Sequence, residues 1–372
     1  MQTYGDISLY FHIPFCKKKC PYCHFYSIYP TPQNIDLFLE GILIELKRLN
    51  LKKNITSIFF GGGTPSLLDP NQIKIILDEI KYKDNCEITL EANPEDISLK
   101  KVKKLKNIGI NRISIGVQSF DDDSLKTLQR RHTSKDTIQS IEKSYEAGIK
   151  NISIDLLYGI PHQSIKSFEK SLKIACNLPI THISLYNLTF EKNTFFYKKR
   201  KILKNFLPSE KDVIKFIKTS KKILKTHNFH QYEIASYAKK NFQSKHNIGY
   251  WTARQFLGLG PSAFSYTKGK RFKNISNLLK YTNLLKKSFS VIDFEEKLKY
   301  PKNVKELLVI NLRLLSGINL KKFQKKIGII PKETFCLIEN FIKDKFLQKK
   351  NNKIKLTSKG ILFYDSIAEL LI

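Results

Sequence analysis

Short hydrophobic runs alternate with longer amphipathic stretches over the first half of the chain. Runs rich in β-branched and aromatic residues predict six strands, at residues 7–11, 55–60, 87–90, 112–117, 152–157 and 182–188. Apolar positions at helical spacing predict helices at residues 71–81, 99–107, 135–147 and 164–176. This alternation is typical of an α/β fold with a parallel sheet. Because a closed barrel needs eight such units, the pattern predicts an open partial barrel or a doubly wound sheet.

Each predicted strand ends in a segment of unusual composition. In chain order these segments are HIPFCKKKCPYC, GGGTPS, EANPE, GVQSF, DLLYG and NLTFE. The carboxyl ends of parallel strands meet at one face of the sheet, where ligand sites form. We therefore expect one functional site that is lined by all six segments.

The alternation stops near Pro208. A basic amphipathic helix is predicted at residues 211–227, followed by the segments QYEIASYA, HNIGYW and LGLGPSAFSY. Residues 304–372 predict two helices, a short hairpin around Asn351 and Asn352, and a terminal helix, in the outline of a winged helix. We predict three regions: a partial barrel over residues 1–207, a connecting region over residues 208–300, and a smaller, mainly helical C-terminal domain over residues 301–372.

The formal net charge of +32 raises the question of a nucleic-acid partner. Only eight of the 65 basic residues are arginine, the side chain that phosphate and base recognition favours, and lysines occur on nearly every predicted helix. We therefore interpret the charge as solvated faces and predict no nucleic-acid partner. The apolar runs are far shorter than the roughly 20 residues that span a membrane, and no export signal precedes the first strand. We expect a cytoplasmic protein without a transmembrane segment.

Three of the six cysteines, Cys16, Cys20 and Cys23, lie within eight residues. Thiolates are preferred ligands of iron–sulfur clusters and of zinc. Structural zinc sites usually combine two separated ligand pairs, and no second pair follows here. Three thiolates can hold three corners of a cubane and leave its fourth iron open to another ligand, which predicts a [4Fe–4S] cluster. A small zinc loop with His24 as the fourth ligand is the alternative.

The loop CKKKCPYC matches the CxxxCxYC signature, so the sequence resembles the radical S-adenosylmethionine (SAM) superfamily. The segments YFHIPFC, GGGTPS, GVQSF, SIDLLYGIP and LGLGPSAFS are similar to the branch that contains oxygen-independent coproporphyrinogen III oxidase and the heme chaperone HemW. The similarity extends from Tyr10 into the C-terminal region. This resemblance implies a partial (β/α)6 radical SAM barrel, a [4Fe–4S] cluster on the three cysteines, and SAM as a cofactor.

The resemblance also implies which residues lie around SAM. Glycine permits close backbone approach, a carboxylate accepts hydrogen bonds, and a guanidinium can fork onto the carboxylate of SAM. Arg131 beside Arg130 leaves the register of that contact open. The residues implied as contacts, or as packing near the cofactor and cluster, are Tyr10, Tyr22, Gly62, Gly63, Thr64, Glu91, Gln118, Arg130 and Asp155.

Two positions distinguish the oxidase from the chaperone within that branch. The oxidase has a fourth cysteine two residues after the third, where this chain has Phe25. Chaperone sequences usually have phenylalanine there, often after aspartate, and this chain has His24 at that preceding position. The segment HNIGYW matches the HNxxYW motif of the chaperones.

Histidine ligates heme iron and aromatic rings offer apolar surface to a porphyrin, so His246 in that motif is a candidate heme ligand. A buried histidine held by hydrogen bonds is the structural alternative. The resemblance thus implies a chaperone that binds heme as cargo and passes it to an acceptor protein. The alternative is an oxidase that decarboxylates coproporphyrinogen III through a 5′-deoxyadenosyl radical.

Overall fold

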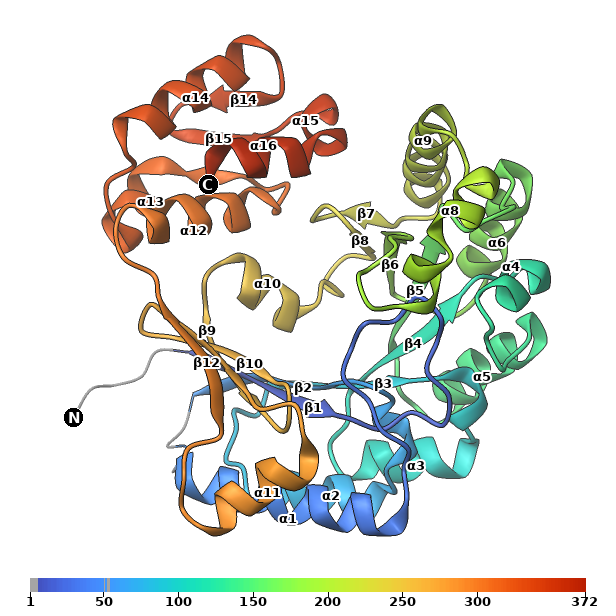
Figure 1. Cartoon of the computed structure of the whole chain (residues 1–372). Helices are drawn as coiled ribbons and strands as arrows, with labels where there is room; N and C mark the ends of the chain where they lie inside the picture. The colour runs from blue at the N-terminus through green and yellow to red at the C-terminus, as the bar shows by residue number, and fades with distance from the viewer. Residues whose placement is uncertain (1–5, 50, 52–53) are drawn as a thin grey trace.

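A wide mixed sheet runs through the larger part of the molecule (Figure 1). The structure is a computed structural model and describes residues 6–49, 51 and 54–372. Among these residues the sheet has twelve strands in the order β12-β11-β10-β9-β1-β2-β3-β4-β5-β6-β8-β7. The six predicted strands form its centre and are parallel to one another. They are β1 (Ile7–Ile13), β2 (Ile55–Gly62), β3 (Glu87–Ala92), β4 (Arg112–Gln118), β5 (Asn151–Tyr158) and β6 (His182–Asn187).

Helices between these strands cover the outer face of the sheet and confirm the predicted α/β alternation. Five of them begin at a polar side chain, Asp69, Ser98, Asp121, Thr133 or Ser164, whose oxygen accepts a backbone N–H of the first turn. The helices of this part are α1 (Pro32–Leu49), α2 (Pro70–Asp78), α3 (Leu99–Asn107), α4 (Asp122–Thr127), α5 (Ser134–Glu146), α6 (Ile165–Asn177), α7 (Phe195–Lys198) and α8 (Arg200–Leu203).

The region predicted as a connection widens the sheet at both edges. Strand β9 pairs in parallel with β1, and β10, β11 and β12 continue that edge with antiparallel pairing, while β8 and β7 extend the edge beyond β6. These strands are short, and two of them are too brief to show an alternating pattern. The elements are α9 (Glu210–Thr226), β7 (His230–Gln231), β8 (Ser236–Ala238), α10 (Lys245–Trp251), β9 (Gln255–Leu259), β10 (Phe264–Thr267), β11 (Lys270–Asn274), α11 (Leu278–Lys286) and β12 (Ile292–Lys297).

The C-terminal part has its own hydrophobic core, which runs from Val304 to Leu371, and it lies to one side of the sheet (Figure 1). The predicted hairpin is present and pairs Lys350 with Lys353. Three helices precede it rather than the predicted two, because Gly328 in the left-handed region ends α13 before α14 begins. The elements are α12 (Lys302–Leu312), β13 (Ile318–Asn319), α13 (Leu320–Ile327), α14 (Lys332–Lys343), β14 (Leu347–Lys350), β15 (Lys353–Leu356), α15 (Ser358–Leu362) and α16 (Tyr364–Leu371).

The main hydrophobic core joins residues from Ile7 to Val291. The first two predicted regions therefore share one core, and a boundary at residue 207 stays a prediction. No helix in the part of the chain that the structure describes is long and apolar enough to span a membrane.

Candidate cofactor site

The cysteine loop leaves the carboxyl end of β1 and returns to it. The backbone N–H of Cys16 donates to the carbonyl of Ile28 at 3.0 Å, and Phe15 forms a bridge with Ile28, so the two ends of the loop are held together. Within the loop, the N–H of Cys23 donates to the carbonyl of Cys20 at 3.1 Å. All three cysteines line one cavity of about 530 Å³ at the carboxyl ends of the parallel strands, which we call the cluster cavity.

Glycines at the end of β2 bring the second loop against the first. Gly62 has a φ of +106°, and a Cβ there would lie 2.6 Å from Nδ1 of His12. A Cβ on Gly63 would lie 2.7 Å from the carbonyl oxygen of Phe15. Because these glycines have no side chains, the loop can pass beside β1. This close approach places Oγ1 of Thr64 3.6 Å from Sγ of Cys16.

Arg130 reaches the cavity from the segment after α4. Its guanidinium donates to Sγ of Cys20 at 3.3 Å, to Oδ1 of Asn93 at 2.6 Å and to the carbonyl of Gly116 at 2.9 Å. Arg131 is exposed to solvent, so of the two neighbouring arginines Arg130 is the one that lines the cavity, and its contact with SAM stays a prediction. The Nε atom of Arg130 is buried without a hydrogen-bond partner among the described residues, so this donor is available to a ligand.

Two carboxyl groups, Glu91 on β3 and Asp155 on β5, line the same cavity. Glu91 accepts the backbone N–H of Gly62 at 3.1 Å, and Asp155 accepts the hydroxyl of Ser114 at 3.3 Å. Burial, reinforced by the charge of Asp155, raises the pKa of Glu91 to about 8, and burial also raises the pKa of Asp155. Neither carboxylate has a salt-bridge partner among the described residues, so a bound cation would be stabilised between them.

These residues fit a [4Fe–4S] cluster with SAM. Burial raises the pKa of the thiols of Cys16 and Cys23, and a bound metal centre would hold them as thiolates. All three thiols line one cavity, which suits a cubane in which each thiolate would bind its own iron. The carboxyl groups of Glu91 and Asp155 suit the positively charged amino group and sulfonium of SAM. The free Nε–H of Arg130 suits the carboxylate of SAM.

The other predicted cofactor residues divide between two cavities. Tyr22 and Gln118 line the cluster cavity with Gly63 and Thr64, and Gln118 has a φ of +65° at the end of β4. Burial raises the pKa of Tyr22, which packs against the ring of Phe196. The contacts of all these residues with SAM stay predictions.

Tyr10, Gly62 and His246 do not line the cluster cavity. They border an inner cavity of about 240 Å³, which also reaches Glu91 and Asp155. His246 is 1% exposed, and its ring nitrogens contact the hydroxyls of Ser57 at 3.0 Å and Tyr250 at 2.8 Å. Burial lowers the pKa of His246 to about 3. The ring therefore has the hydrogen-bonded environment of the structural alternative, and heme ligation by His246 stays a prediction that requires one of these two contacts to break.

The structure adds residues that the sequence did not single out. Asn93 accepts from Arg130, and its amide donates to Oγ1 of Thr64 at 3.3 Å, so it connects the arginine to the glycine loop. Tyr186 and Asn187 line the cluster cavity at the end of β6. Asn93 lies two residues beyond Glu91, and residues two apart on a strand share a face. That spacing within EANPE was the signal that could have identified it.

Comparisons with known proteins agree with this geometry. The profile of the radical SAM superfamily matches residues 10–175, and that of the HemN C-terminal domain matches residues 302–363. The chain is 33% identical to the heme chaperone HemW of Bacillus subtilis, over 97% of both chains. It is 35% identical to the heme chaperone HemW of Buchnera aphidicola subsp. Schizaphis graminum, over 98% of both chains.

A solved structure shares the fold. The coproporphyrinogen III oxidase HemN from Escherichia coli, a radical SAM enzyme, superposes with a TM-score of 0.86 at 22% sequence identity, over 99% of this chain and 90% of that chain. The two proteins therefore share the partial barrel and its C-terminal extension. Similarity to the chaperones over nearly the whole length, together with the cysteine loop at the strand ends, shows that the chain belongs to the HemW family of the radical SAM superfamily.

Proposed function

We propose that this protein is a cytoplasmic heme chaperone that binds heme and transfers it to an acceptor protein. The observation that carries the proposal is the similarity to proteins named heme chaperone HemW, which extends over 97% or more of the chain. The presence of Phe25 in place of the fourth cysteine of the oxidases supports the same choice. Its ring is 51% exposed and borders the cluster cavity.

The cysteines, Arg130 and Glu91 of the cluster cavity have different roles in this proposal. Cys16, Cys20 and Cys23 would hold the cluster through their thiolates, and the cluster with SAM would supply radical chemistry when bound. Arg130 ties the Cys20 thiol to β4 through the Gly116 carbonyl, so the loop keeps one position. Glu91, whose pKa is raised to about 8, becomes a carboxylate at neutral pH when a positive charge is placed beside it.

Heme titration under anaerobic conditions tests the function directly. The full chain, with its cluster reconstituted, is titrated with heme, and we expect a Soret band that saturates at one heme per chain. Addition of an apo-form heme protein should then move the Soret absorbance to the acceptor. Failure to form the stoichiometric complex, with and without cluster and SAM, would contradict the proposal.

A parallel assay examines the oxidase alternative. The same reconstituted protein is incubated anaerobically with coproporphyrinogen III and SAM, and we expect no protoporphyrinogen. A Phe25→Cys variant serves as the comparison, because it restores the thiol that distinguishes the two groups. Turnover by the unmodified chain would replace the chaperone with the enzyme.

A further inference from the structure

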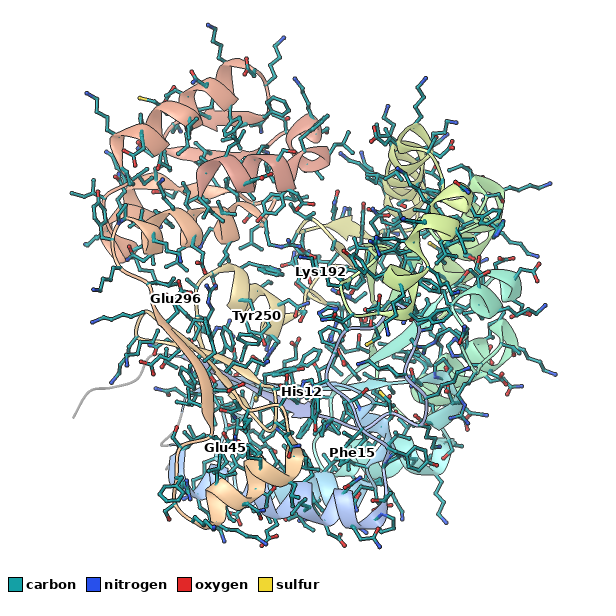
Figure 2. All side chains as sticks on the ribbon, in the orientation of Figure 1. His12, Phe15, Glu45, Lys192, Tyr250 and Glu296 are labelled. Atoms are coloured by element: carbon teal, nitrogen blue, oxygen red, sulfur yellow. The ribbon has the colours of Figure 1, made fainter. Side chains whose placement is uncertain are left out.

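A second cavity, of about 520 Å³, lies between the sheet and the C-terminal helices. Its walls come from β1, the cysteine loop, α10, the β9–β10–β11 edge and α12. Aromatic rings dominate the lining, among them Tyr26, Tyr250, Phe256, Phe264 and Tyr266. Figure 2 shows Tyr250 between His12 and the C-terminal helices. We call this space the aromatic cavity; its volume and apolar walls are typical of a site for a small organic ligand.

The cavity wall carries polar groups whose interactions are incomplete. The indole Nε1 of Trp251 is buried without a hydrogen-bond partner among the described residues. Arg271 is neutralised by Glu296 at 2.6 Å and Glu306 at 2.9 Å.

Two other cations of the wall lack such neutralisation. Arg254 contacts only the hydroxyls of Ser8 and Thr56, and Lys273 lies 5.7 Å from the ring centre of Phe264. Within the described ranges neither forms a salt bridge, and Asp6 and Glu87 act on Arg254 only through longer-range charge interactions, so both cations can pair with an anionic ligand beside the aromatic walls. A flat apolar ligand with carboxylate groups complements this surface.

Two histidines border the aromatic cavity, and only one has free ring nitrogens. His12 is 4% exposed, with Nδ1 3.1 Å from the hydroxyl of Tyr10 and Nε2 3.0 Å from the carbonyl of Tyr26. His246 lies outside the lining and has both nitrogens engaged. His24 is exposed; its ring contacts the ring of Phe25, at 4.6 Å between centres, and among the described residues its ring nitrogens have no hydrogen-bond partner. A metal ligand needs a nitrogen lone pair, and His24 is the residue that offers one.

We propose that heme occupies the aromatic cavity, with the imidazole of His24 as the protein ligand of the iron and with Lys273 and Arg254 receiving the propionates. This inference rests on the proposed function and assigns it a site. Imidazole is a common ligand of heme iron, and charge-assisted hydrogen bonds hold the carboxylates. Trp251, from the HNIGYW motif, forms part of the cavity wall and offers its indole N–H as a donor. His246 lies outside the cavity and positions the Tyr250 ring through its hydrogen bond.

The same assignment places the cargo beside the cluster. His24 directly follows the cluster ligand Cys23, and both His24 and Phe25 border the aromatic cavity and the cluster cavity. A heme held by His24 therefore lies against the loop that carries the cluster ligands.

The ligand assignment is tested with a His24→Ala variant of the full chain after cluster reconstitution, with acid-labile sulfide measured first to show that the cluster is intact. We expect heme affinity to fall about tenfold or more, equivalent to at least about 1.4 kcal/mol. The Soret maximum and the ferric electron paramagnetic resonance spectrum should change, and added imidazole should restore both. Affinity for metal-free protoporphyrin IX should stay unchanged. His230→Ala, at an exposed histidine on β7, is the matched control.

The cavity assignment is tested with Lys273→Glu against the control Lys280→Glu on α11. Quenching of Trp251, the single tryptophan of the chain, reports occupancy of the cavity. We expect Lys273→Glu to weaken heme and protoporphyrin IX alike, by roughly tenfold, the size of one charge-assisted hydrogen bond. If the unmodified chain binds no heme, the proposed function fails. If it binds heme and either His24→Ala or Lys273→Glu matches its control, the site is elsewhere and the function stands.

Discussion

Burial determines the protonation of polar groups around the two cavities. The imidazole of His246 lies between two hydroxyls, and burial, reinforced by the charges of Arg254 and Arg112, lowers its pKa to about 3. His24 has the same side chain but lies at the surface between the cavities. The two rings therefore have different surroundings: His246 is a fixed neutral hydrogen-bonding group, and His24 is an accessible imidazole.

The buried state of His246 predicts a pH dependence of stability. The unfolded chain binds a proton at this ring below about pH 6.5, whereas the folded chain stays neutral down to about pH 3. The free energy of unfolding should therefore fall as the pH is lowered through this window, by about 1.4 kcal/mol per pH unit from this residue.

Urea unfolding between pH 7 and pH 5 measures this contribution. His246→Gln keeps a polar side chain but cannot titrate, so its stability should fall less steeply than that of the unmodified chain. His230→Gln, at an exposed position, should leave the slope unchanged. Equal slopes for the unmodified chain and His246→Gln would show that the ring is protonated in the folded state.

The position of helix α10 depends on a carboxylate from the sheet. Glu87 at the start of β3 is buried and accepts the backbone N–H groups of Lys245 at 3.0 Å and His246 at 2.9 Å, and the hydroxyl of Ser244 at 3.4 Å. These are the free donors of the first turn of α10, which a negative charge stabilises. The helix is only seven residues long, so this anchor rather than its own propensity holds it against the sheet.

Removal of that anchor should loosen α10. We expect Glu87→Ala to lower the free energy of unfolding by about 2–3 kcal/mol, because buried donors lose a charged acceptor. The emission of Trp251 at the end of the helix should shift to longer wavelength before global unfolding. Glu295→Ala on β12 is the control, since its exposed pair with Lys270 should contribute less than about 1 kcal/mol. Unchanged emission and stability in Glu87→Ala would contradict the anchor.

The two hydrophobic cores are joined by a charged contact. Arg313 from the C-terminal part pairs with Glu233 at 3.2 Å, and its guanidinium lies 4.3 Å from the ring centre of Trp251. Glu233 is 2% exposed, and it forms a bridge with Leu314. The aromatic cavity has walls from both sides of this junction, so its shape depends on the contact.

Breaking one half of the pair should therefore affect the whole molecule. Arg313→Ala leaves a buried carboxylate alone and should cost about 3 kcal/mol, whereas Arg313→Ala with Glu233→Gln should recover much of that loss. Calorimetry of the two variants, with hydrogen exchange in α12, measures the effect on stability and on docking. Lys349→Ala, which removes an exposed pair with Glu339, should change stability by less than about 1 kcal/mol. A double variant no more stable than Arg313→Ala would contradict a specific pair.

Periodicity and residue chemistry were sufficient to predict the central six strands, four of the helices between them and the cysteine loop at their carboxyl ends, but they missed α1 and α4. These features depend on neighbouring residues: burial on both faces gives each parallel strand its hydrophobic run, and thiolate spacing is set within eight residues. Arg130 and Glu91 could be named because the family pattern supplies their positions. The same local pattern missed the sheet edges, where β7 and β8 have two and three residues and are stabilised by pairing with distant strands.

The tertiary structure alone decided the roles of chemically identical side chains. Arg130 enters the cluster cavity and the adjacent Arg131 faces solvent. His246 belongs to a recognisable motif, yet its environment is set by Ser57, which is 189 residues away in the chain. His24 carries no motif signal and gains its position from a cavity whose walls come from five separate segments. Hydrogen bonding and burial depend on which distant segments meet, and that information becomes available only when the sheet and the C-terminal helices are assembled.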